Sequence, residues 1–235
     1  MKALYYDPAK EIIWIGTHLG GLNKLDIRTG TFTHYLMEEG NPETLPSNIV
    51  RDIAPYQDQL IVATQNGVCL FNPQTGKCQQ LFKDSKEGRK IAMVADVEVD
   101  NSGTLWIAAT GEGIFSYRFD TNKLTNYRHD GTQAHSLSNN NVNNIMQDSK
   151  GNLWFSTSGS GLDLYRSATN DFENFDKGKN GLVSDCIYDT QESPVSGKLI
   201  LITNQGFSIF DQKVEKFQNY SVENGFPLTA VNENA

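Results

Sequence analysis

The sequence repeats itself at intervals in the mid-forties. "GNLWFSTSGSGLDLYR" at residues 151–166 returns as "GTLWIAATGEGIFSYR" at 103–118 and as "EIIWIGTHLGGLNKLD" at 11–26. Two further copies carry isoleucine in place of tryptophan. The equivalent positions, separated by 47, 45, 48 and 46 residues, are Trp14, Ile61, Trp106, Trp154 and Ile200. A period of this length is typical of the four-stranded blades of a β-propeller.

Each repeat divides into four short segments with strand character. In the fourth copy, turn residues separate the predicted strands 142–148, 153–157, 161–166 and 172–176. These segments alternate in part between apolar and polar side chains, which indicates strands packed between neighbouring sheets. Sustained helical periodicity is not found anywhere in the chain. The sequence therefore predicts an all-β protein.

The repeats place about five blades in one propeller segment, residues 1–235. A closed ring of five blades leaves no place for the further first strand predicted at the end of the chain, "AVNENA". We therefore expect an open or partial fragment of a larger propeller, and a closed five-blade ring followed by a tail is the alternative. The predicted blades are 1–47, 48–93, 94–140, 141–185 and 186–226, followed by the first strand of another blade.

The recurring glycines, aspartates and tryptophans have structural explanations. The turns that begin at Asp100 and Asp148 predict hairpins in which the aspartate accepts backbone N–H bonds and the glycine adopts positive φ. The tryptophan positions also accept isoleucine, so they indicate packing between blades and not a platform for stacking a sugar or a base. A glycine opens the third strand of every copy, at Gly21, Gly67, Gly113, Gly161 and Gly206.

Composition excludes several classes of function. The net charge is −8 and the basic residues are scattered, which argues against a nucleic-acid partner. The apolar runs are all much shorter than the roughly 20 residues of a membrane helix, and the first residues lack the features of a secretory signal. Of the three cysteines, Cys69 and Cys78 lie on adjacent predicted strands. Buried free thiols are the favoured interpretation, and a disulfide is the alternative.

The repeat resembles a known family. "DSKGNLWFSTSGSGLDLYR…DFENF" and "DNSGTLWIAATGEGIFSYR…KLTNY" are similar to the two-component regulator propeller repeat, and "LPSNIV", "LSNNNV" and "GLVSDCI" are similar to its connections between blades. The resemblance covers essentially the whole chain, although copies two and five lack tryptophan. It implies the periplasmic sensor region of a hybrid two-component system histidine kinase, whose larger propellers have seven blades.

This resemblance implies a function and partners. We expect a ligand-sensing extracytoplasmic module of a signal-transduction receptor that responds to an oligosaccharide. The implied partners are the rest of the sensor propellers and a second receptor copy in a homodimer, without direct membrane contact. The kinase would lie elsewhere in the receptor, so we expect this segment not to be an enzyme.

The sequence shows no constellation of catalytic, metal-binding or cofactor-binding residues. Its four histidines form no zinc motif, and a nucleophile elbow is absent. We therefore predict no catalytic residues, no metal and no cofactor. Two alternatives to a sensor stay open, namely a propeller-fold glycoside hydrolase or lyase, and a protein–protein interaction scaffold. Converging carboxylates would favour the enzyme, and an exposed apolar face would favour the scaffold.

The long polar connections between blades are the predicted binding region. Asn48, Asn140 and Asp185 precede the innermost strand in three copies, and Thr229 takes that place in the last copy. Their side chains would bond sugar hydroxyls, together with His129 and His135 from the longest connection. The competing interpretation, which these residue types favour, is that the Asn and Asp side chains cap turns by bonding local backbone, while the histidines are merely solvated.

Overall fold

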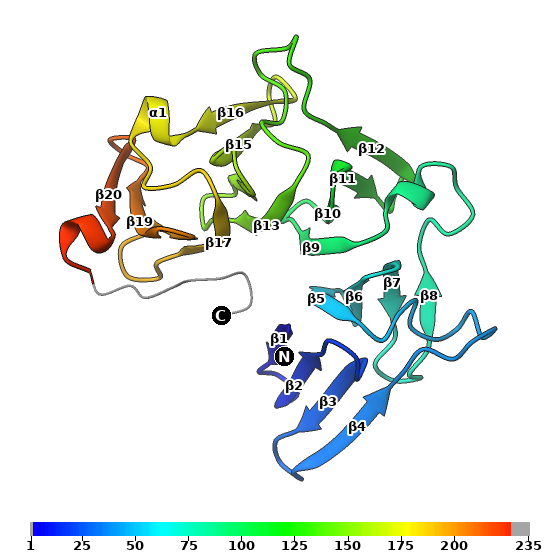
Figure 1. Ribbon diagram of the computed structural model, residues 1–235. Coiled ribbons are helices and arrows are strands. Elements are labelled where there is room, and N and C mark those ends of the chain that lie inside the picture. Colours follow the sequence, from blue (N-terminus) through cyan, green and yellow to red (C-terminus); the bar gives the residue numbers. More distant parts are fainter. Residues whose placement is uncertain (1, 227–235) are drawn as a thin grey trace. The chain divides into compact units, whose positions relative to one another are not determined.

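The computed structural model describes residues 2–226, which form twenty strands in five four-stranded antiparallel sheets (Figure 1). Each sheet is a simple meander whose consecutive strands are neighbours. This is the blade that the repeat predicts, and the all-β prediction is confirmed. The predicted first strand of a further blade lies outside the described residues.

The strands follow the same order in all five sheets. The first sheet contains β1 (Ala3–Asp7), β2 (Ile12–Gly16), β3 (Leu22–Asp26) and β4 (Thr31–Tyr35). The second contains β5 (Val50–Tyr56), β6 (Gln59–Thr64), β7 (Gly67–Phe71) and β8 (Cys78–Gln80). The third contains β9 (Val94–Val99), β10 (Thr104–Ala109), β11 (Gly113–Arg118) and β12 (Lys123–Tyr127). The fourth contains β13 (Val142–Gln147), β14 (Leu153–Thr157), β15 (Leu162–Arg166) and β16 (Asp171–Phe175). The fifth contains β17 (Ile187–Glu192), β18 (Leu199–Thr203), β19 (Gly206–Asp211) and β20 (Lys216–Tyr220).

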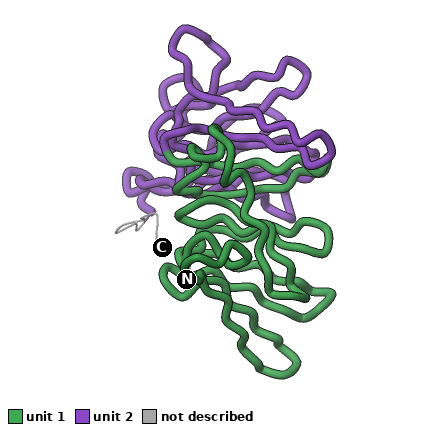
Figure 2. The backbone as a smooth tube through the Cα atoms, turned by 90° about the vertical axis from the view of Figure 1, so that its right-hand side faces the viewer, with its two compact units in different colours: residues 1–110 green, residues 111–235 purple. Residues whose placement is uncertain are grey.

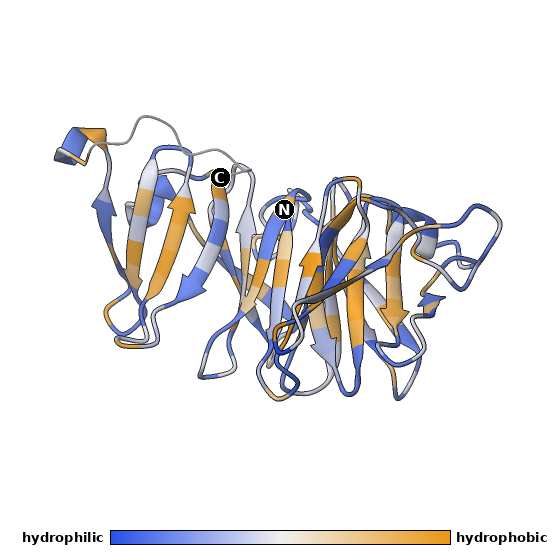
Figure 3. Cartoon of the chain, turned by 90° about the horizontal axis from the view of Figure 1, so that it is seen from below, coloured by the Kyte–Doolittle hydropathy of each residue, from blue (hydrophilic) through white to orange (hydrophobic). Residues whose placement is uncertain are grey.

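The chain divides into two compact units, residues 1–110 and 111–235 (Figure 2). In both units the hydrophobic segments lie mainly on the strands and the turns are largely hydrophilic (Figure 3). The first unit holds the first and second blades, and the second unit holds the fourth and fifth. The interfaces between these pairs of blades form the described cores.

The repeated tryptophans lie in these interfaces. Trp14 of the first blade is 2% exposed and meets Phe71 of the second blade edge-on, with ring centroids 5.5 Å apart. Trp154 of the fourth blade meets Phe210 of the fifth in the same way, at 5.9 Å. A sheet that is apolar on both faces must bury each against another layer, and here the indole side of one blade packs on the next blade. The tryptophans are thus part of the scaffold in these two interfaces.

The hairpin aspartates hold the indoles as well as the turns. Asp148 accepts bonds from the backbone N–H groups of Lys150 and Asn152, as the sequence predicts. It also accepts a bond of 3.0 Å from the Trp154 indole Nε1. The Asp100 carboxylate does the same for the Trp106 indole, at 2.8 Å. One carboxylate therefore closes the turn and orients the side chain that packs between blades.

The glycine that opens the third strand is required by close backbone approach. At Gly161 φ is +82°, and a Cβ would lie 2.1 Å from the carbonyl oxygen of Phe175 at the end of β16. A contact this short with backbone allows no side chain. The same position is equally tight in three other blades, at Gly21, Gly113 and Gly206.

A short helix, which the sequence does not predict, lies in the connection between the fourth and fifth blades. Helix α1 (Lys177–Asn180) is a single turn. Asp176 caps it by accepting the Lys179 N–H, and Gly181 ends it in the left-handed conformation. Local capping chemistry thus produces one helical turn that has no helical periodicity in the sequence.

Replacement of Gly161 by alanine should destabilise the protein far more than replacement of Gly151. Both glycines have positive φ, at +82° and +87°, but a Cβ at Gly151 would meet nothing closer than 3.9 Å. We expect a loss of about 1 kcal/mol in unfolding free energy for Gly151→Ala and about 3 kcal/mol or more for Gly161→Ala. Urea unfolding of the two variants tests this, and equal losses would contradict the backbone contact.

Candidate functional site

The three predicted residues that precede the innermost strands share one hydrogen-bonding role. Each side chain accepts a backbone N–H from the start of its own connection. The pairs are Asn48 with Met37 at 2.7 Å, Asn140 with His129 at 2.8 Å, and Asp185 with Lys177 at 2.6 Å. Their backbone carbonyls accept the N–H groups of the strand-opening glycines, Gly21, Gly113 and Gly161. These residues therefore clamp the connections, as the competing interpretation holds, and their ligand-binding role stays a prediction.

The two predicted histidines lie on the connection between the third and fourth blades, residues 128–141. His129 Nδ1 bonds the carbonyl oxygen of Leu137 at 2.9 Å, and its backbone N–H is held by Asn140. The backbone carbonyl of His135 accepts the N–H of Phe172 on β16. The structure thus brings His129 and Asn140 together. Asn48 belongs to the other unit, and Thr229 lies outside the described residues.

A buried carboxyl lies beneath this connection and is not singled out by the sequence. The Asp163 side chain is fully buried and accepts bonds from the Ser138 N–H at 3.0 Å, the Ser138 hydroxyl at 2.7 Å and the Asn174 amide at 3.1 Å. Burial raises the pKa of Asp163 to about 6, although these hydrogen bonds oppose the shift. The carboxyl therefore ties the connection to the blade and changes charge near neutral pH.

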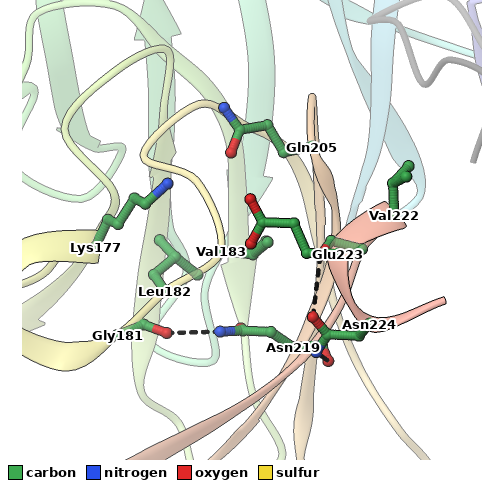
Figure 4. A pocket seen from close by; sticks show the side chains of 10 residues that line it. Lys177, Gly181, Leu182, Val183, Gln205, Asn219, Val222, Glu223 and Asn224 are labelled. Atoms are coloured by element: carbon green, nitrogen blue, oxygen red, sulfur yellow. Dashed lines mark hydrogen bonds between the residues drawn. The ribbon is translucent and has the colours of Figure 1, made fainter. Parts of the chain in front are cut away.

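A recess of about 560 Å³ opens over the connection end of the fifth blade (Figure 4). Its volume falls within the range of small-molecule sites. Val183 supplies apolar surface above the buried Leu182, and Lys177, Gln205 and Glu223 supply an ammonium, an amide and a carboxylate. The remaining lining residues are Gly181, Asn219, Ser221, Val222 and Asn224.

The wall of this recess is held by internal hydrogen bonds. The Asn219 amide donates to the Gly181 carbonyl at 2.8 Å, and its oxygen accepts from the Ser208 hydroxyl at 2.7 Å. The Asn224 amide in turn donates to the Asn219 carbonyl at 2.9 Å. These bonds fix the position of β20 against the incoming connection, so the wall is formed before any ligand arrives.

Three polar side chains of the recess have capacity for a ligand. Within residues 2–226, the Lys177, Gln205 and Glu223 side chains make no hydrogen bond or ion pair. Lys177 begins α1, Gln205 lies in the turn between β18 and β19, and Glu223 lies after β20. Three segments distant in sequence therefore present a cation, an amide and an anion to one opening. Sequence reasoning misses them because they come from separate segments and no other repeat has all three residue types at the equivalent positions.

The recess recurs at the same place in the second blade. There it measures about 290 Å³ and is lined by the incoming connection, the turn between β6 and β7, the end of β8, and the connection that follows β8. Its polar lining residues are Asn66, Gln80, Lys83 and Arg89. The second and fifth blades thus each have a recess at the end that lies between two connections, and the predicted binding role of the connections stays a prediction.

Glu98, on the innermost strand β9, is a weaker acid than an ordinary glutamate. Burial, followed by the charges of Asp52 and Asp100, raises the pKa of Glu98 to about 7. Asp52 accepts the Val97 N–H at 3.2 Å, and Asp100 is held by its hairpin turn. Glu98 thus has the acidity of a general acid or base.

In the described part of the chain, no group of three His, Cys, Asp or Glu residues is arranged to hold a metal.

The buried Asp163 carboxyl should make the folded protein less stable as pH rises. Because folding raises its pKa, Asp163 makes unfolding easier as pH rises from about 4 to 6. Between pH 4.5 and pH 7.5, the parent protein should lose about 2 kcal/mol more unfolding free energy than Asp163→Asn does, because only the parent ionises this buried group. Urea unfolding at the two pH values measures it.

Asp148 provides the matched control for Asp163 in the same blade. Burial opposes its ionisation, but the bonds from Trp154 and Asn152 outweigh burial and lower the pKa of Asp148. Its carboxylate therefore stabilises the fold above pH 4, and this contribution is lost as pH falls through the lowered pKa. Asp148→Asn should lose stability at pH 7.5. A pH profile of Asp163→Asn identical to that of the parent would contradict the assignment.

Solved structures with a similar fold include an extracellular domain of a two-component system, a lyase and a calcium-binding protein. The extracellular domain of a hybrid two-component system from B. thetaiotaomicron has a TM-score of 0.79 at 24% identity, and the match covers 93% of this chain and 28% of that chain. Virginiamycin B lyase from Staphylococcus aureus has a TM-score of 0.69 at 12% identity, covering 94% and 69%. The calcium-binding protein regucalcin from Agrobacterium tumefaciens has a TM-score of 0.59 at 17% identity, covering 94% and 73%.

The chain is thus much shorter than the hybrid-system domain, since it spans about a quarter of that length. These likenesses confirm the predicted β-propeller of four-stranded blades. The described residues include no helix that is long and apolar enough to cross a membrane.

Two family matches divide the sequence between them. Residues 3–137 match the SMP-30/gluconolactonase/LRE-like region, and residues 136–159 match the two-component regulator propeller. The second match confirms the resemblance that the repeat shows. A search of the curated proteins finds no match. Because the first match covers more than half of the sequence, the chain belongs to the SMP-30/gluconolactonase/LRE-like family, and it carries the two-component regulator propeller repeat at residues 136–159.

Proposed function

We propose that this chain is the ligand-sensing extracytoplasmic module of a hybrid two-component receptor, and that the recess of the fifth blade binds an oligosaccharide. The observation that carries the proposal is the presence of three polar side chains around one preformed opening, Lys177, Gln205 and Glu223, which have no partner among residues 2–226. The regulator repeat and the fold of the hybrid-system domain support the sensor class. A periplasmic location belongs to the same proposal.

The chemistry of the recess suits a neutral polyhydroxyl ligand. A carboxylate accepts bonds from adjacent hydroxyls, an ammonium donates to them, and an amide does both. Lys177 and Glu223 carry opposite charges, so their sum gives no preference for a charged ligand. Val183 and Val222 offer an apolar surface to the less polar face of a sugar ring. These features favour an oligosaccharide over a nucleotide or an organic acid.

The position of the recess suggests how binding is passed on. Lys177 lies in the connection that enters the fifth blade, and Glu223 lies in the segment that leaves it. A ligand that bonds both residues holds the two connections at one separation. Because a ligand shifts an equilibrium only through differential affinity, the receptor arrangement with this separation is the one favoured. The other sensor propellers and a second receptor copy are the partners that would register the change.

An enzyme is the second candidate. The family name includes gluconolactonase, the lyase from S. aureus has a similar fold, and Glu98 has a pKa of about 7. Incubation with oligosaccharides and sugar lactones, followed by product analysis, decides between the two classes. Turnover that is lost in Glu98→Gln would establish the enzyme, and ligands recovered intact would support the sensor.

Binding should depend on the recess and not on its surroundings. We expect a thermal-shift screen of plant and host-glycan oligosaccharides to yield a stabilising ligand, because a tenfold excess over Kd gives about 1.4 kcal/mol. For that ligand, Lys177→Ala and Glu223→Gln should each weaken binding by about tenfold or more, since each removes a bond to a charged group. Isothermal titration calorimetry measures both losses.

The adjacent lysine of α1 is the control. Lys179 is 75% exposed, pairs with Asp176, and is outside the recess lining, so Lys179→Ala should bind normally. Loss of binding in Asn140→Ala together with normal binding in both recess variants would move the site to the connections. An absence of any stabilising ligand across the panel would overturn the oligosaccharide assignment.

A further inference from the structure

We infer that Cys69 and Cys78 form a reversible disulfide within the second blade. In the structure both residues are thiols, and their sulfur atoms lie 3.1 Å apart. Cys69 is on β7 and Cys78 is on β8, the last strand of the sheet. Sulfur atoms at this separation have no other atom between them.

The strand register places both side chains on one face of the sheet. Cys69 lies opposite Gln80, and Cys78 lies opposite Phe71. Because side chains alternate between faces along a strand, Cys78 and Gln80 share a face, and so Cys69 and Cys78 are diagonal neighbours on it. A disulfide has a sulfur–sulfur length of about 2.05 Å. The thiols therefore need to approach by only about 1 Å, without a change of register.

The folded state protects both thiols from solution. Cys69 is 0% exposed and Cys78 is 6% exposed, within the core shared with Trp14 and Phe71. Burial, and then the neighbouring thiol, raise the pKa of Cys69, which keeps it protonated. Because the thiolate is the reactive form, oxidation requires an opening of this region.

Strand β8 is the element that can open. It is three residues long, stands at the edge of its sheet, and pairs with β7 alone in that sheet. Elements with few partners open locally at a free energy below that of global unfolding, and outside its sheet β8 is held by the bond from the Cys78 N–H to the Glu43 carbonyl, at 2.8 Å. Opening of β8 carries Cys78 toward solvent, while Cys69 stays on the inner neighbour. Cys78 is therefore the residue that reacts first.

The chemistry is thiol–disulfide exchange with a low-molecular-weight disulfide. The Cys78 thiolate attacks one sulfur of that disulfide, forms a mixed disulfide and releases one thiol. As β8 re-pairs with β7, the Cys69 sulfur loses its proton, attacks the Cys78 sulfur and releases the second thiol. Two protein thiols are oxidised by two electrons, and one external disulfide is reduced to two thiols.

The bond would change the behaviour of the neighbouring recess. Gln80 of β8 and residues of the connection that follows it, 81–93, line the recess of the second blade. A disulfide that ties β8 to β7 removes the local opening and holds this lining in place. The oxidised state of the pair would thus fix the shape of a ligand-sized cavity that the reduced state leaves free to open.

Oxidation in a glutathione redox series tests the inference on the purified chain. We expect a mass loss of about 2 Da, a Cys69–Cys78 cross-linked peptide, a melting temperature higher by about 5 °C, and slower hydrogen exchange in residues 78–92. Dithiothreitol should reverse all four. Cys186, in the other unit, supplies the internal control, so Cys186→Ser should behave as the parent does.

Several outcomes would overturn the inference. Unfolded samples from the most oxidising buffer are alkylated, and recovery of Cys69 and Cys78 as alkylated thiols would exclude the bond. Stable glutathione adducts on either residue would also exclude it, because the second thiol would not have reacted. The Cys78→Ser variant should lose the cross-linked peptide and the temperature shift. If that variant folds poorly, alkylation and peptide mapping of the parent chain still decide whether the bond forms.

Discussion

The packing of one blade on the next is the interaction on which the rest of this structure depends. Trp14 against Phe71 and Trp154 against Phe210 show the same arrangement in the two units. A four-stranded sheet buries too little surface by itself, and the repeated apolar faces provide a layer for each neighbour. The hairpin carboxylates of Asp100 and Asp148 then orient the indoles of Trp106 and Trp154. Most of the repeated residues are thereby committed to the scaffold.

A polar position inside the blades controls where the connections lie. The second residue after the strand-opening glycine is polar in the first, fourth and fifth blades, where it bonds a side chain of the fourth strand. The pairs are Asn23 with His34, Asp163 with Asn174, and Ser208 with Asn219. Asp163 is long enough to accept two bonds from Ser138 and to hold the incoming connection close. Ser208 is shorter and meets only the Val183 N–H of its incoming connection, at 3.4 Å. In the fifth blade the connection is tied instead by the Asn219 amide, which donates to the Gly181 carbonyl at 2.8 Å.

The sequence alone predicts the fold, because the repeat reveals strands, turns and blade faces at once. It also identifies the residues that clamp the connections, since Asn48, Asn140 and Asp185 recur at one position. The structure adds the clamping hydrogen bonds, to backbone groups eight or eleven residues away, and leaves the ligand-binding role a prediction. The recess is beyond the reach of pattern analysis, because Lys177, Gln205 and Glu223 come from separate segments. The pKa of Glu98 likewise depends on burial and on the charge of Asp52, which lies on another blade.

A repeat protein divides its residues in a way that guides the search for function. A residue type that recurs among the blades answers to a constraint of the blade, such as the carbonyl oxygen that excludes a side chain at Gly161 and at its equivalents in three other blades. Chemistry that serves a ligand or a partner has no reason to recur, because a ligand meets one blade or one connection. The unrepeated polar residues of the fifth blade and the cysteine pair of the second blade satisfy this criterion, whereas the tryptophans and strand-opening glycines do not. Functional specificity in this chain therefore lies in the departures from its repeat.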